Sequence, residues 1–106
     1  MARALEIAEL RQDKLRRAAA LKLSGMALRI AGRPADALDP LRTAMTLSAV
    51  SEDALLGGEI LYECGLALLA LERTDEARQS FLSALDAFQR IGAQGWIEKV
   101  ASQIEQ

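Results

Sequence analysis

Apolar residues recur at spacings of three and four along almost the whole chain, which is the period of amphipathic helices. Polar or turn-forming segments interrupt this pattern around Asp13, Gly32, Ser51, Arg73 and Gly92. The pattern therefore predicts an all-α chain of about six helices. Ala and Leu dominate, and aromatic residues make up only 4%, a composition that favours helix over strand.

Residues that begin or end helices set the expected boundaries in the first half of the chain. A first helix from near Met1 ends at RQD, Asp13 caps a second helix, and Gly32 ends that helix. Pro34 opens a third helix. Pro40 then removes a backbone donor inside it, so we expect a kink or a loosened first turn, with a start at Asp39–Pro40 as the alternative.

The second half carries similar signals. Ser51 or Asp53 begins a fourth helix, Thr74 or Asp75 caps a fifth, and Gly92 ends that one. A sixth helix follows, with one apolar side and a polar outer side that suits the end of a helical stack.

Two stretches of the chain repeat each other at a period of forty residues. GMALRIAGRPADALDPLRTAM, from Gly25 to Met45, aligns without a gap with GLALLALERTDEARQSFLSAL, from Gly65 to Leu85. The register extends to the start of the chain through Ala4, Ala44 and Ala84, and through Met1, Leu41 and Phe81. A pair of helices that recurs at a fixed period is typical of a solenoid.

The repeated residues resemble the tetratricopeptide repeat. That family has a small residue in the first helix of each hairpin, then an Ala, a bulky residue and a small residue in the second. The matching residues are Gly25, Ala37, Leu41 and Ala44, and again Gly65, Ala77, Phe81 and Ala84. Small residues let the two helices of a hairpin approach closely, and we expect the bulky residue to fill the gap between successive hairpins.

The sequence departs from that family in two respects. Leucine stands at the family's aromatic positions in the first helix, and the period is longer than the usual 34 residues. The long period is similar to that of sensor regions in large bacterial ATP-dependent transcription activators and related signal-transduction proteins. The resemblance thus implies a bacterial regulatory or signalling context.

The resemblance implies a single domain over residues 1–106, built as a short solenoid of antiparallel helical hairpins. Residues 1–12 form the second helix of a truncated repeat, 13–50 and 53–92 form two repeats, and 93–106 form a C-terminal capping helix. Because Met1 aligns part-way along a second helix, we infer that the chain is a piece of a longer array. An ordinary six-helix bundle is the alternative.

Composition argues against most enzymatic chemistry. The chain has no histidine, which removes imidazole bases and the usual zinc sites, and its glycines form no phosphate-binding loop. Cys64 lies in an apolar segment and is expected to be a buried core residue. Asp75 and Glu76 stand at a helix start, where they favour the helix dipole. We therefore expect no enzyme activity, cofactor or metal.

Charge and hydropathy narrow the range of partners and compartments. The net charge is −2 and the basic run RQDKLRR has no second basic cluster, so no nucleic-acid partner is expected. The most apolar stretch, from Ala54 to Leu71, contains Glu59 and Glu63, so no membrane span is expected. An acidic N-terminus and a single cysteine suit the cytoplasm.

What remains is binding to a protein or peptide. In the family that the chain resembles, the first helices of successive hairpins line a concave groove, and matching positions here form a candidate partner-binding groove. Its residues are Lys22, Met26, Arg29, Glu59, Tyr62, Glu63, Leu66 and Leu69. The alternative for Met26, Leu66 and Leu69 is burial by a neighbouring repeat.

The resemblance therefore implies a scaffold for protein–protein interaction. A self-association module, in which terminal helices of two copies stack into a homo-oligomer, is the alternative.

Overall fold

The computed structural model describes residues 2–51 and 53–105, and the side chains of residues 6, 9–49 and 53–105. Its helices are α1 (Ala2–Ile30), α2 (Pro34–Ser51), α3 (Ala54–Ala70), α4 (Thr74–Ile91) and α5 (Gln94–Glu105). No strand occurs within these ranges, so the predicted all-α class is confirmed.

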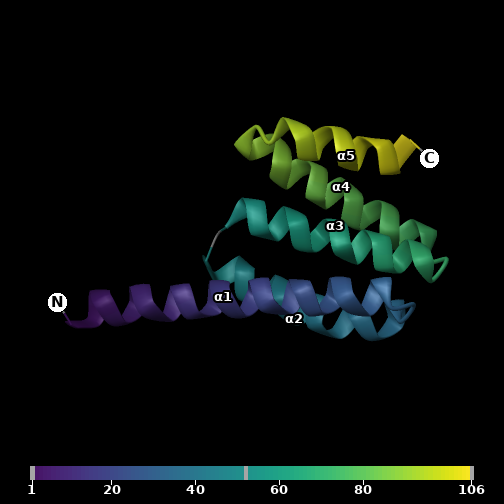
Figure 1. Ribbon diagram of the computed structural model, residues 1–106. Helices are drawn as coiled ribbons and strands as arrows, with labels where there is room; N and C mark the ends of the chain where they lie inside the picture. The colour runs from purple at the N-terminus through teal and green to yellow at the C-terminus, as the bar shows by residue number, and fades with distance from the viewer. Residues whose placement is uncertain (1, 52, 106) are drawn as a thin grey trace.

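The helices form antiparallel pairs that stack side by side (Figure 1). α1 packs on α2 and α3 packs on α4, while α2 also contacts α3 and α4 also contacts α5. The stack is elongated, with extents of 51 × 30 × 19 Å. The predicted arrangement of stacked helical hairpins is therefore confirmed, with α5 as a single helix against the second hairpin.

The predicted helix break at Arg11–Asp13 is wrong, because α1 is continuous from Ala2 to Ile30. Residues 11–17 contain no Gly or Pro, and their Arg, Gln, Lys and Leu residues are good helix formers. Asp13 does not cap a helix here and instead pairs with Arg16 one turn later, at 3.7 Å. The chain thus has five helices over the described ranges instead of about six. The expected packing of the side chains of Met1 and Ala4 lies outside the described residues.

The turns of the two hairpins repeat each other at the forty-residue period. Gly32 and Glu72 both adopt left-handed conformations, with φ of 82° and 61°. After each, the next backbone N–H donates back into the preceding helix, from Arg33 to Leu28 O (2.8 Å) and from Arg73 to Leu68 O (2.9 Å). These bonds satisfy carbonyl groups that a helix end leaves without partners. The sequence repeat is therefore also a structural repeat.

The helix starts agree with the sequence at two points and differ at a third. Asp53 caps α3 by accepting a bond from Leu56 N–H at 2.9 Å, and α2 begins at Pro34 and remains helical through Pro40, so the alternative start is wrong. Thr74, however, is the first residue of α4 and is not its cap. The preceding Arg73 makes no side-chain cap.

Each hairpin closes where a glycine of the first helix meets a bulky residue of the second. A Cβ atom added to Gly25 would lie 2.5 Å from Leu41 Cγ, and one added to Gly65 would lie 2.5 Å from Phe81 Cε1. Leu41 and Phe81 are almost fully buried. The predicted close approach is confirmed, but the bulky residue packs against the glycine of its own hairpin, where a contact between successive hairpins was expected.

The second hairpin has a further contact of this kind. A Cβ atom added to Gly58 would lie 2.6 Å from Phe88 Cε1, and the Phe88 ring stacks on Trp96 of α5 with centroids 4.9 Å apart. Gly58 therefore lets the Phe88 ring lie inside the hairpin, while the other face of this ring packs on α5. The adjacent Gly57 has open space around it.

These contacts predict opposite effects for the same substitution at two glycines of α3. Gly65→Ala forces a methyl group into Phe81 and is expected to lower the free energy of unfolding by about 1–3 kcal/mol, despite the better helix propensity of Ala. Gly57→Ala meets no neighbour and is expected to raise it by about 0.5–1 kcal/mol. Urea denaturation measures both. Equal effects at the two positions would contradict the packing argument.

Candidate partner-binding surfaces

The charged residues of the candidate groove pair with each other across two helices. Lys22 Nζ of α1 lies 3.5 Å from Glu59 Oε1 of α3, and Arg29 Nε donates to Glu63 Oε2 at 2.9 Å. Glu63 is only 7% exposed, so this pair compensates a carboxylate that has lost most of its water. These four side chains therefore join the first helices of the two hairpins.

Tyr62 lies at the next junction along the stack, where α5 packs on the second hairpin. It is 8% exposed, and its ring contacts Phe81 at 5.8 Å and Trp96 of α5 at 5.6 Å between centroids. The Lys99 ammonium lies 4.8 Å from the Trp96 ring centroid and 5.9 Å from that of Tyr62, a cation–π geometry. Tyr62 thus contributes to the packing of α5 on the second hairpin.

The remaining groove residues are apolar and more accessible. Met26 and Leu66 are half-buried, and Leu69 is 39% exposed. The structure therefore brings the four charged residues together in pairs, separates Tyr62 from them, and leaves only part of this face open to a partner. Binding of a partner at this face stays a prediction.

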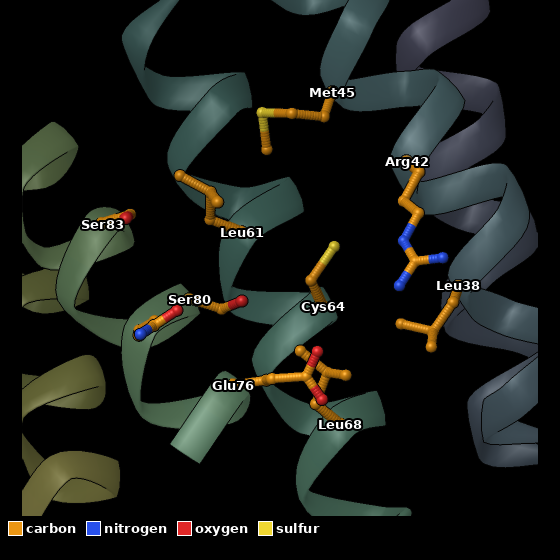
Figure 2. Close-up of a pocket in the computed structure, with 10 residues that line it drawn as sticks. Leu38, Arg42, Met45, Leu61, Cys64, Leu68, Glu76, Ser80 and Ser83 are labelled. Atoms are coloured by element: carbon orange, nitrogen blue, oxygen red, sulfur yellow. The ribbon is translucent and has the colours of Figure 1, made fainter. Parts of the chain in front are cut away.

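A second groove, which the sequence did not predict, lies between α2 and α4 with α3 as its floor (Figure 2). Two cavities of about 370 and 500 Å³ share Met45, Leu61 and Ser83 and so form one continuous depression. The first is lined by Leu38, Arg42, Met45, Leu61, Cys64, Leu68, Glu76, Gln79, Ser80 and Ser83. The second adds Ser48, Ala49, Asp53, Ala54, Gly57, Asp86, Ala87 and Arg90. We call this depression the α2–α4 groove.

The groove has an apolar floor, and its α4 wall has three small side chains, Ser80, Ser83 and Ala87, among longer polar ones. Figure 2 shows Leu61 and Cys64 of α3 between Met45 and Arg42 of α2 on one side and Ser83 of α4 on the other. Small side chains on α4 leave room beside the floor. This wall cannot be recognised from the sequence, because serines on a helix face are read as solvent-exposed when the neighbouring helix is not known.

Charged groups stand at the edges of the groove. Arg42 makes no ion pair with any residue that the structure describes. Glu76 is held by Arg73, whose hydrogen bonds and charge lower the pKa of the Glu76 carboxyl, with a smaller contribution from Arg42. Asp86 and Arg90 pair at 2.9 Å. Arg42 is therefore the cation in the groove that is available to a ligand's anionic group.

Cys64 sits on the groove floor but is not activated. Burial raises the pKa of its thiol to about 11, and Arg42 opposes this shift only in part. The residue is buried, as the sequence predicted. A thiol in such surroundings is a weak nucleophile because the thiolate is the reactive form.

Neither a metal-binding cluster nor a membrane-spanning helix is found among the described residues. Among them, no three His, Cys, Asp or Glu side chains gather where a metal ion can bind. None of the helices in the described ranges has the length and apolar content needed to cross a membrane.

Comparison with protein-family models, with curated proteins and with solved structures finds no significant match. The tetratricopeptide resemblance therefore stays a prediction that rests on the repeated residues of the chain itself.

The raised pKa of Cys64 predicts that its thiol reacts slowly with alkylating reagents. At pH 8, a thiol with a pKa of about 11 is roughly one part in a thousand thiolate, against about a quarter for an ordinary cysteine. Alkylation of Cys64 by iodoacetamide is thus expected to be on the order of 100-fold slower in the folded protein than in urea. The rate should still rise with pH above 9, and a plateau near pH 8 would contradict this.

Proposed function

We propose that the chain is a protein–protein interaction module that holds a segment of a partner protein in the α2–α4 groove. The observation that carries the proposal is the groove itself, an apolar floor on α3 between α2 and α4, where Ser80, Ser83 and Ala87 leave room beside the floor. Stacked helical hairpins offer rigid extended surfaces of this kind. The resemblance to tetratricopeptide repeats adds the proposal of a bacterial regulatory or signalling setting in the cytoplasm.

The shape of the groove favours an amphipathic helix as the bound segment. Its lining runs along α2 from Leu38 to Ala49, about 17 Å at 1.5 Å per residue. A partner helix covers this length in about three turns and places apolar residues at spacings of three and four against Leu61 and Leu68. An acidic residue beside that apolar stripe reaches Arg42, which has no ion pair of its own among the described residues.

Filling the groove is expected to abolish binding. A helical peptide of about 15 residues is selected from an amphipathic library on the wild-type protein. Its affinity is then measured by calorimetry for Ser83→Arg, which places a long side chain in the groove, and for Gln89→Arg, an exposed position on the same helix outside it. We expect at least a tenfold loss for Ser83→Arg and none for Gln89→Arg.

Two further variants separate the two candidate faces. Arg42→Gln is expected to weaken peptides that carry the acidic residue and to leave the others unchanged. Leu69→Lys alters the accessible part of the face predicted from sequence. If selected peptides lose affinity only with Leu69→Lys, the partner binds along α1, α3 and α5 and the α2–α4 groove is not the site.

Self-association is a second candidate, and one observation on α1 favours it. Leu23 and Ile30 are 60% and 72% exposed and lie on one side of α1 with Ala27. Forty residues on, Glu63 and Ala67, which match Leu23 and Ala27, are buried, while Ala70, which matches Ile30, is exposed. The same side that forms an interface in α3 is thus open in α1, and an open apolar face of a stack favours contact with another copy.

Self-association through α1 predicts that light scattering at micromolar concentration gives twice the mass of one chain. Leu23→Gln with Ile30→Gln removes the apolar side chains and is expected to return the protein to a monomer. Leu82→Gln, on the exposed side of α4, serves as the control because it is 45% exposed and lies on another helix. A monomeric wild-type protein would exclude self-association through α1.

A further inference from the structure

A separate cavity of about 230 Å³ lies where the end of α3, the start of α4 and the end of α5 meet. Figure 1 shows this end of the stack, with the C-terminal part of α5 above the α3–α4 turn. Its lining is mostly apolar and comprises Leu69, Ala77, Phe81 and Ile104, with Thr74, Arg78 and Gln103 as the polar members. None of these residues lines the α2–α4 groove.

The matching place in the first hairpin is differently occupied. Forty residues before Leu69 and Gln103 stand Arg29 and Glu63, whose side chains pair at 2.9 Å between α1 and α3. In the second hairpin, this guanidinium and carboxylate are replaced by an apolar side chain and a neutral amide. The pair that joins one junction is therefore missing from the next, and a cavity lies there.

An arginine is nevertheless present at the cavity, from another helix. Arg78 of α4 lines it, whereas the matching residue of α2 is Leu38, which is 5% exposed. Arg78 is exposed and makes no ion pair with any residue in the described part of the chain. The second junction thus has the Arg78 guanidinium beside an apolar cavity. It lacks a carboxylate like that of Glu63, which pairs with an arginine at the first junction.

We propose that this cavity binds a small apolar carboxylate. The hydrocarbon part lies among Leu69, Phe81 and Ile104, and the carboxylate is held by Arg78, with the Gln103 amide as a further donor. Guanidinium groups bind carboxylates through paired hydrogen bonds. A volume of about 230 Å³ corresponds to about eight water molecules at roughly 30 Å³ each, which suits a ligand of about the size of hexanoate.

The probe is hexanoate, with hexylammonium and hexanamide as ligands of equal length and different charge. We expect hexanoate to bind with a dissociation constant of about 1 mM and to shift the methyl resonances of Leu69 and Ile104 in NMR spectra. The neutral amide should bind at least tenfold more weakly, and the ammonium ion should not bind. Equal binding of all three would show that only the apolar walls attract the ligand, which overturns the proposal.

Two variants test the roles of the polar residues. Arg78→Gln is expected to weaken hexanoate at least tenfold, while Arg42→Gln, the same change in the α2–α4 groove, should leave its affinity unchanged. Gln103→Glu supplies the carboxylate found in the first hairpin, so it should pair with Arg78 and abolish hexanoate binding in a protein whose circular dichroism is unaltered. Undiminished binding to either Arg78→Gln or Gln103→Glu would overturn the proposal.

Discussion

The structure depends on how closely the two helices of each hairpin approach. Gly25 and Gly65 are placed where any side chain would overlap a bulky residue on the facing helix. The contact fixes the separation of the helices and hence the position of Leu41 and Phe81 in the core. Because α2 and α4 are each positioned by such a contact with their own first helix, the space between α2 and α4 follows from hairpin geometry, and that space is the α2–α4 groove.

The two junctions between successive helical layers use different chemistry at matching positions. The first is crossed by the ion pair of Lys22 with Glu59. At the positions forty residues on, the second has the Lys99 ammonium over the Tyr62 ring, with the Trp96 ring packed against Tyr62. The backbone repeat tolerates this exchange because the turns and glycine contacts do not depend on it. The interior of each hairpin is thus constrained, whereas the junctions vary and leave differently shaped cavities between layers.

Much of the fold was predictable because its signals are local. The turn after Gly32, the cap at Asp53 and the end of α4 at Gly92 follow from residues that favour one backbone conformation. The helix break predicted at Asp13 is absent because the local signal there is weak. One acidic residue among good helix formers does not end a helix. The groove between α2 and α4 was beyond sequence reasoning, because it depends on side chains from three helices that meet only in the tertiary structure.

The contrast between the junctions has a consequence for how the protein responds to its solvent. Dissolved salt screens the attraction between Lys22 and Glu59, whose side chains retain 17% and 24% of their exposure. Salts that are excluded from protein surfaces strengthen apolar contacts such as that between Phe88 and Trp96. A salt that is excluded from protein surfaces, such as sulfate, therefore acts in opposite directions at the two ends of the stack, weakening the ion pair between α1 and α3 while strengthening the apolar contact of α5 with α4.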